Sequence, residues 1–338
     1  MTVVVAPGRV NLIGDHTDYV GGLAMPCAID LAVTATFDAA DDIELTSDAT
    51  AEPAAFTFPL AEDQLGVEPT TWRRLVYAVA SLMDAPRGVR GRLTTTLPIG
   101  AGLSSSAACT IALALTLGFD PADRRGLVLL AQASEQKATG VPSGVLDQLA
   151  IVYSEAGHAC VVDANAVTAT TVPIPDDLAI VVIHSGHARA LSDTPYAQRR
   201  AEAERAMAEV GGLADATVAD ALAIPEPLLR RRARHVITEN HRVQAMADAF
   251  ARNDAKQAGA LMLESHASLR KDAEVSTKDL DQLVDALSTR RGVYGARLTG
   301  AGFGGSAVAL VAVDVAGEIA GTFGGRVVIP SAGARVVS

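Results

Sequence analysis

The chain is poor in the residues that mark several classes of protein. Its three cysteines, Cys27, Cys109 and Cys160, lie in apolar surroundings without a CxxC spacing, so we expect neither a disulfide framework nor a cysteine metal site. No apolar run is long enough to span a bilayer, and the N-terminus reaches Gly8 and Arg9 too early for a signal-peptide core. These absences predict buried thiols in a cytoplasmic protein that binds no membrane.

Positive charge is scarce as well. The 338 residues include 28 basic and 39 acidic side chains, a formal net charge of −11, which argues against a nucleic-acid binder. One basic cluster, Arg230 to Arg232 with Arg234, falls in a helical stretch and is predicted to be a solvated face. Hydrophobic residues make up 49% of the chain, enough to bury a large core, and at this length we expect two lobes with a boundary near 155–180.

Strand and helix patterns alternate along the chain. Strand-forming residues predict strands over 3–6, 24–37, 92–97, 158–163 and 178–184. Apolar periodicity predicts helices over 71–84, 104–118, 123–140 and 145–153, with a mostly helical region over 192–290 and two closing strands around 298–310. Acidic, proline-bearing stretches near 38–70 and 173–177 are interpreted as loops. The pattern indicates a mixed α and β fold.

The most informative stretch is 98–108, PIGAGLSSSAA. Gly100 and Gly102 let the backbone approach an anion without a Cβ in the way. The apolar run that follows predicts a buried helix, whose first N–H groups and dipole favour an anion. Serine hydroxyls at the start of a helix can cap it, or bind a phosphate or its metal ion. Because the lysine of a GxxxxGK[ST] loop is missing, the stretch is either a capped turn or a phosphate loop of another architecture.

Three further segments carry polar residues among glycines. Residues 6–22, APGRVNLIGDHTDYVGG, crowd polar side chains at a density unusual for a surface turn. In 134–148, SEQKATGVPSGVLDQ, Glu135 lies on a helix and Asp147 follows a glycine-proline bend. Alone, each of these acids would be interpreted as a solvated side chain or a cap. The third segment, 298–310, LTGAGFGGSAVAL, would alone be a tight turn between strands.

Together the segments resemble those of the galactokinases, within the GHMP superfamily of small-molecule kinases. The galactokinase signature reads GEHTDY where residues 14–19 of this chain read GDHTDY. PIGAGLSSSAA is similar to the superfamily phosphate loop, GVPSGVLDQ to its catalytic segment and LTGAGFGGSAV to its third motif. The stretches 192–204 and 261–284 also follow the galactokinase pattern, so the resemblance covers nearly the whole chain.

The resemblance implies the two-lobed α+β fold of the GHMP kinases. Residues 1–165 would form an N-terminal lobe like ribosomal protein S5 domain 2, residues 166–338 would form an α/β C-terminal lobe, and the active site would lie between them. The implied activity is ATP-dependent phosphorylation of the anomeric 1-hydroxyl of galactose with Mg²⁺, by a monomer.

The resemblance also assigns the catalytic, metal and nucleotide residues. Asp147 matches the aspartate that accepts the proton of the anomeric hydroxyl, and Arg9 the arginine beside it, whose fixed charge offsets that of the transferring phosphoryl group. Ser106 and Glu135 match the Mg²⁺ ligands, which are oxygen donors as this ion requires. Trp72 lies where the family places a tryptophan near the adenine. The loop residues expected to bind the phosphates are Gly100, Ala101, Gly102, Leu103, Ser104, Ser105 and Ser106, with Gly300, Gly302, Gly304 and Gly305 supporting them from behind.

The residues that match sugar-contacting positions are Arg9, Asp15, His16, Asp18, Gly144, Asp147 and Tyr196. Because Asp15 is one methylene shorter than the family's glutamate, its contact near the 6-hydroxyl must be lost, bridged by water or restored by a backbone shift. We therefore expect tolerance of change at C6. Two alternatives stay open: a kinase of a related deoxy or amino sugar, and a sensor that binds sugar and ATP without turnover. The complete serine–alanine run argues against the sensor.

Overall fold

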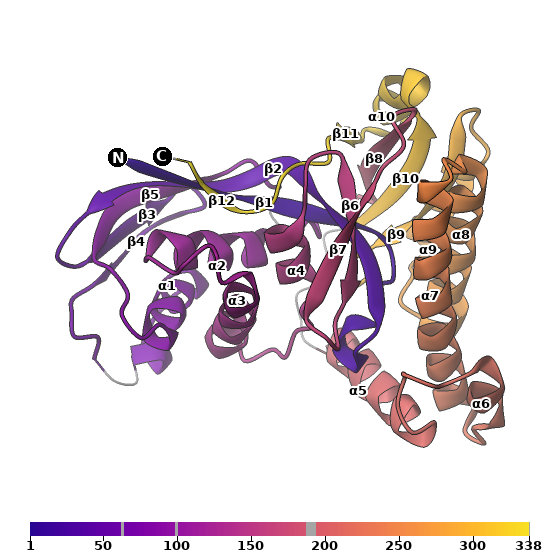
Figure 1. The fold of residues 1–338 in the computed structure, drawn as a ribbon, viewed down its shortest axis with the longest axis horizontal. Helices are drawn as coiled ribbons and strands as arrows, with labels where there is room; N and C mark the ends of the chain where they lie inside the picture. The colour runs from indigo at the N-terminus through magenta and orange to yellow at the C-terminus, as the bar shows by residue number, and fades with distance from the viewer. Residues whose placement is uncertain (62–63, 99–100, 187–193, 338) are drawn as a thin grey trace.

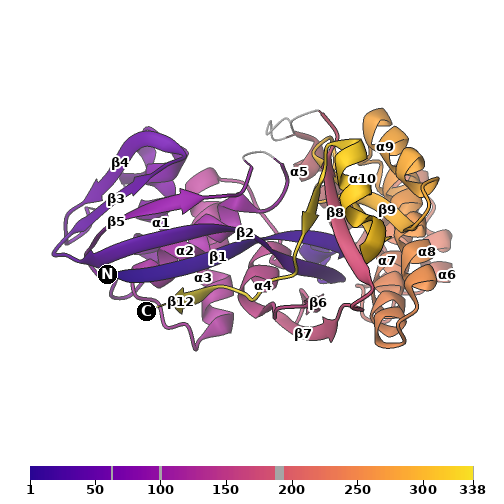
Figure 2. The same cartoon turned by 90° about the horizontal axis from the view of Figure 1, so that it is seen from above.

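The computed structural model describes residues 1–61, 64–98, 101–186 and 194–337, and its first half is built on an eight-stranded sheet (Figures 1 and 2). The long strands β1 (Thr2–Ile13) and β2 (Leu23–Ala39) pair along most of their length. Beyond β2 follow β5 (Val89–Thr95), β3 (Ile43–Ser47) and β4 (Thr50–Phe56). At the start of β2 the sheet adds β6 (His158–Asp163) and β7 (Thr168–Pro173). β12 (Arg335–Val337) pairs with the first residues of β1.

One face of this sheet is covered by helices (Figure 1). They are α1 (Thr71–Leu82), α2 (Ser105–Thr116), α3 (Arg124–Thr139) and α4 (Leu146–Tyr153). α2 and α4 contact β1 and β2 directly, and α2 also contacts the other three helices. This central position explains why α2 is apolar on nearly all sides, with Ile111 and Leu113 fully buried.

A second sheet and a group of helices form the other end of the molecule (Figure 2). The sheet has the order β11 (Arg326–Val328), β8 (Leu178–His184), β10 (Ser306–Ala312) and β9 (Val293–Thr299). The helices are α5 (Thr194–Glu209), α6 (Val218–Ala223), α7 (Pro227–Ala251), α8 (Ala255–Ser268), α9 (Lys278–Ser288) and α10 (Ala316–Phe323). A π-helical turn, Leu269–Ala273, follows α8. α7 also packs on β1 and β2, so it connects the two ends.

The predicted long elements agree with the structure, whereas the loop predicted over 38–70 is wrong. That stretch contains the β3–β4 hairpin. It also contains a short turn of 3-10 helix, Gln64–Gly66, before α1 begins. In the hairpin Ile43, Leu45 and Phe56 face the core, while the acidic residues between them face outward. The sequence pattern does not predict the hairpin, because each strand is short and Pro53 interrupts the alternation of apolar and polar residues in β4.

The prediction of a solvated basic face on α7 is wrong for Arg232. Its side chain is 2% exposed and forms ion pairs with Glu202 of α5 at 2.8 Å and with Glu274 at 2.7 Å. Both acids come from other elements, so the sequence around Arg232 gives no sign of them.

The sequence also predicted buried thiols and a boundary between the two lobes. All three cysteines are free; Cys27 and Cys160 are buried and Cys109 is half-buried. The predicted boundary at 165/166 falls in the turn between β6 and β7. Across the described ranges, no helix combines the length and apolar character needed to cross a membrane.

Candidate active site

The carboxylate of Asp147 is held from two sides at the centre of the candidate site. Asp147 lies in the first turn of α4, and its Oδ1 accepts from Arg9 Nε of β1 at 2.7 Å, with Arg9 Nη2 at 2.5 Å. Its Oδ2 accepts from the Ser104 hydroxyl at 2.5 Å. The structure thus brings together two residues that the sequence assigned to catalysis, Arg9 and Asp147, and one that it assigned to the phosphate loop, Ser104; Arg9 and Asp147 are 138 positions apart.

Ser104 holds Asp147 in place of capping its own helix. It occupies the residue before α2 with φ 60°, a left-handed conformation that is uncommon for a residue with a Cβ, and makes no side-chain cap. An N-cap hydrogen bond and an unstrained backbone are each worth about 1 kcal/mol. Ser104 lacks both the cap hydrogen bond and an unstrained backbone, and its side chain contacts the Asp147 carboxylate instead. Backbone strain of this kind is typical of functional sites.

The described part of the phosphate loop is tied to both lobes through its carbonyls. Arg9 donates through Nη1 to the Gly102 carbonyl at 2.8 Å and through its backbone N–H to that of Leu103 at 3.2 Å. Ser306 of β10 donates to the Ala101 carbonyl at 2.9 Å. With its carbonyls held behind, the loop leads into the backbone N–H groups of Ser105 and Ser106 at the start of α2. Gly100 lies outside the described residues.

A carboxyl and a hydroxyl suited to a metal ion lie beside the start of α2. Glu135 of α3 accepts hydrogen bonds from Ser106 and from Gln148 of α4. Burial raises the pKa of Glu135 to about 7, against the opposing effect of these hydrogen bonds, and the charge of Asp147 adds to the rise. No cluster of three or more histidine, cysteine or acidic side chains that could hold a metal occurs within the described ranges. A cation here would therefore take oxygen ligands beyond the protein, such as phosphates and water.

Asp18 and Gly144 meet at the junction of the first motif with the start of α4. Asp18 Oδ2 accepts from the Leu146 backbone N–H at 3.3 Å. A Cβ on Gly144 would lie 1.7 Å from the same oxygen, so only glycine leaves room for this carboxyl. Burial, with repulsion from Asp147, raises the pKa of Asp18 to about 6.

His16 completes this side of the site with two tyrosines. His16 has φ 63°, and its Nε2 lies 3.0 Å from the Ala301 carbonyl in the third motif, so Nε2 carries the proton. In the neutral ring Nδ1 then accepts from the Tyr19 hydroxyl, 3.0 Å away. The ring centres of His16, Tyr19 and Tyr196 lie 5.9–6.0 Å apart, so Tyr196 of α5 reaches the residues with which the sequence grouped it.

Asp15 is placed differently from its neighbours. Its side chain is buried, with Oδ2 2.7 Å from Arg297 Nη2 of β9 and Oδ1 accepting from the Gly300 backbone N–H at 3.1 Å. Both oxygens therefore face the C-terminal sheet. Its predicted contact with the sugar stays a prediction.

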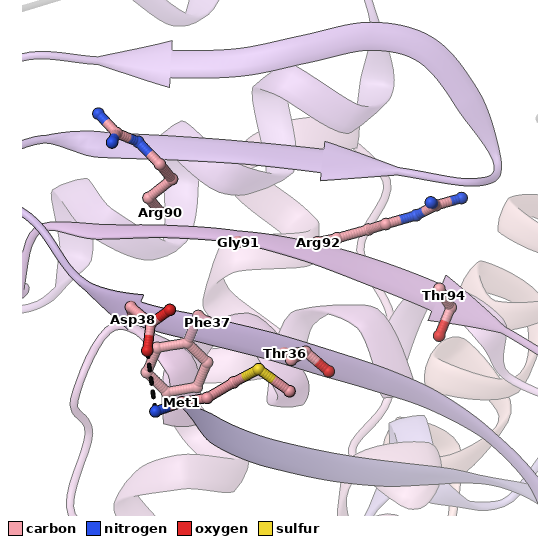
Figure 3. Close-up of a pocket in the computed structure, with 8 residues that line it drawn as sticks. All are labelled: Met1, Thr36, Phe37, Asp38, Arg90, Gly91, Arg92 and Thr94. Atoms are coloured by element: carbon pink, nitrogen blue, oxygen red, sulfur yellow. Dashed lines mark ion pairs between the residues drawn. The ribbon is translucent and has the colours of Figure 1, made fainter.

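Two further features are Trp72, which is buried, and a cavity in the first sheet. Trp72 is the second residue of α1 and is 9% exposed in the main core, and its role near adenine stays a prediction. A cavity of about 330 Å³ opens at the far end of the first sheet, between Met1, Phe37 and Arg92 (Figure 3). It shares no residue with the candidate site.

The sequence did not single out Tyr19, Gln148, Arg297 or Glu239 as site residues. Tyr19 and Gln148 stand inside quoted motifs, next to assigned residues, so proximity in the chain was a usable signal. Arg297 directly precedes the third motif, and Glu239 lies in a helix without any motif. Only the packing of α7 and β9 against the first motif brings those two to the site.

Comparison with known proteins gives matches along most of the chain. Residues 2–38 match the model described as the galactokinase galactose-binding signature, 74–155 the GHMP kinases N-terminal domain and 246–321 the GHMP kinases C-terminal model. A galactokinase of Roseiflexus sp. (strain RS-1) is 39% identical, over 91% of this chain and 83% of its own. That of Pyrococcus furiosus is 36% identical, over 94% of this chain and 90% of its own.

Solved structures show the same fold. The crystal structure of Lactococcus lactis galactokinase complexed with galactose matches with a TM-score of 0.89 and 29% identity, over 99% of this chain and 94% of that one. A mevalonate kinase structure, 18% identical with a TM-score of 0.65, shares the fold alone. The two-lobed α+β kinase fold expected from the motifs is confirmed.

Proposed function

This chain belongs to the galactokinase family, and from that premise we propose that it transfers the γ-phosphoryl group of ATP to the anomeric 1-hydroxyl of galactose, giving galactose 1-phosphate and ADP. The observation that carries the proposal is the fixed carboxylate of Asp147. It stands where the phosphate loop, through Ser104, meets the first motif, through Arg9. A proton acceptor at that junction is within reach of both a bound phosphate and a bound sugar.

In the proposed reaction Asp147 accepts the proton of the 1-hydroxyl as that oxygen forms a bond to the γ-phosphorus. The bond from the γ-phosphorus to the bridging oxygen breaks, and ADP leaves with the electron pair. Arg9 keeps the carboxylate oriented through two contacts and places a fixed positive charge beside the transferring group. The N–H groups at the start of α2 bind the phosphates.

Ser106 and Glu135 fit a Mg²⁺ ion, because both offer oxygen atoms and the two side chains already meet through a hydrogen bond at the start of α2. When bound, the ion would neutralise β- and γ-phosphate charge. His16, Asp18, Gly144 and Tyr196 would then surround the sugar, and Asp15, the residue that differs from the family signature, lies in the same loop. We further propose a monomeric, cytoplasmic enzyme, in keeping with three free cysteines.

A sugar panel tests the proposal. ADP release is measured with Mg-ATP and galactose, galactosamine, 6-deoxygalactose or glucose, with and without Mg²⁺, and with the D147N variant as the control for contaminating kinases. We expect galactose to give high kcat/KM, glucose to be poor, and omission of Mg²⁺ to abolish turnover. ADP release with galactosamine or 6-deoxygalactose but not with galactose would support the related-sugar alternative, and absence of ADP release with every sugar would support the sensor.

A further inference from the structure

A buried arginine joins the sugar motif to the C-terminal lobe. Arg297 of β9 is fully buried, and its Nη2 lies 2.7 Å from Asp15 Oδ2 and 3.9 Å from Glu239 Oε1 of α7. Its Nη1 donates to the Asn11 carbonyl of β1 at 3.3 Å. With Arg242, which pairs with Glu239 at 2.7 Å, the cluster holds two positive and two negative groups. The charges balance, as burial requires.

α7 fixes the backbone of the same loop at three points. Glu239 Oε1 accepts from the Gly14 N–H at 3.0 Å, and Asn240 Oδ1 accepts from the Leu23 N–H at 2.7 Å. His235 Nε2 lies 3.0 Å from the Asp15 carbonyl and therefore donates to it. His235 and Glu239 are four positions apart and so project from one face of the helix. The loop that carries His16 and Asp18 is thus held by the opposite lobe.

The placement of Asp15 follows from this arrangement. Asp15 is 4% exposed; its Oδ1 accepts from the Gly300 N–H, and its Oδ2 forms an ion pair with Arg297 without the geometry of a hydrogen bond. Turning the carboxylate toward a sugar would leave the Arg297 guanidinium buried beside a single distant acid, which is costly. A hydroxyl group of a ligand would have to compete with a buried ion pair.

We propose that Arg297 is a positioning residue for the sugar site, and that it holds Asp15 as a bridge between the lobes in place of a direct contact with the sugar. The proposal rests on the proposed galactose 1-kinase activity and deepens it. The ion pair of Arg297 and Asp15 fixes the position of His16 and Asp18, so both residues of the pair affect the affinity for galactose through the same contact. It also leaves the sugar's 6-position without a carboxylate contact, so that selectivity there is weak.

The test uses D15N, R297M, R297K and the D15N/R297M pair in the full chain. We expect D15N and R297M each to raise KM for galactose about tenfold, with KM for ATP changed by less than about twofold. R297K retains the charge and should restore part of the loss. The double variant should be little worse than either single one, because both remove the same bridge. If R297M fails to fold, the double variant, which leaves no unpaired Asp15 carboxylate, keeps the comparison possible.

Two further measurements separate positioning from general destabilisation and from direct contact. L287A, which removes a fully buried side chain of α9 from the core of the second lobe, is the control for a loss of stability and should leave KM for galactose unchanged. The ratio of kcat/KM for 6-deoxygalactose to that for galactose should lie within about tenfold of one and stay the same in D15N. Rejection of 6-deoxygalactose by the unmodified enzyme that disappears in D15N would overturn the proposal. Additive effects of D15N and R297M would also overturn it, whereas absence of turnover with either sugar would contradict the proposed function itself.

Discussion

At the scale of single residues, the site depends on carboxyl groups whose surroundings differ. Asp147 is paired with Arg9 and Asp15 with Arg297, whereas Asp18 forms no ion pair with any residue that the structure describes. Their types and order in the chain were predictable, because the motifs place them. Their surroundings were not, because Arg297 lies 282 positions from Asp15 and no local pattern links the two.

Replacement of Asp147 by asparagine tests its role as proton acceptor. The amide is close in size: its oxygen can still accept from Arg9, while its NH2 group can donate to the Ser104 hydroxyl oxygen, so folding and ATP binding should be retained. Turnover should fall by about two to four orders of magnitude, as expected for loss of a positioned base. The measurements are kcat from ADP release and ATP affinity from calorimetry. Near-normal kcat in D147N would assign the proton to another group.

Asp18 predicts a pH dependence of stability. Its pKa is raised to about 6 from an ordinary value of 3.8 by burial and by repulsion from Asp147. As pH rises from about 4 to 6 the unfolded chain loses this proton before the folded chain does, so the contribution of Asp18 to stability is lost. D18N cannot ionise there. The difference in Tm between D18N and the unmodified protein should therefore shift in favour of D18N between pH 4 and 7. A difference that is constant over this range would contradict the raised pKa.

At the scale of elements, the long helices were predictable and the short edge strands were not. α1, α2, α3 and α4 lie within two residues of their predicted bounds, because each buries a continuous set of apolar residues. β7 and β11 were missed: β7 has no buried residue and so no apolar face to give an alternation, and β11 has only three residues. The strand predicted over 3–6 extends as β1 to Ile13, through the charged Arg9 that the site requires. A strand that carries a functional polar side chain departs from the apolar pattern, so a prediction from that pattern alone ends too early.

The start of α4 gives a prediction about Gly144. An alanine Cβ would lie 1.7 Å from Asp18 Oδ2 and 2.3 Å from its Cγ. The neighbour is the end of a side chain and can rotate away, but it would then lose the Leu146 N–H. We expect G144A to raise KM for galactose by about tenfold or more, with little change in Tm. G317A in α10, where an added Cβ meets nothing within 4 Å, is the matched control. Unchanged KM for galactose in G144A would show that Asp18 can leave this position without cost.

At the scale of the whole molecule, the sheets are joined by segments that cross between them. α7 packs on β1 and β2 while it belongs to the helices of the second lobe, and after β11 the chain returns to the first sheet as β12 (Figures 1 and 2). The active-site residues come from both ends of the chain, from Arg9 in β1 to Ser306 in β10. Their relative positions therefore depend on how the lobes are held together.

The returning segment gives a prediction about the whole fold. Backbone N–H groups of Ser331, Gly333 and Ala334 donate to Ala28, Ser154 and Ile151 of the first lobe at 2.7–2.9 Å, and β12 then pairs with β1. At about 1 kcal/mol for each hydrogen bond, a chain that stops after Val328 should lose about 3–5 kcal/mol of stability and several degrees of Tm. It should also aggregate more readily, because the edge of β1 becomes unpaired.

No residue of the segment contacts Asp147 or Arg9 in the described structure, so kcat and KM at low temperature should be unchanged. S331A, which removes the hydroxyl contacts to the Ile29 and Ala332 carbonyls and leaves the backbone bonds in place, is the control for a smaller loss. A truncated chain with the Tm of the full one, or with intact stability and altered KM, would show that the segment does not act by closing the first sheet.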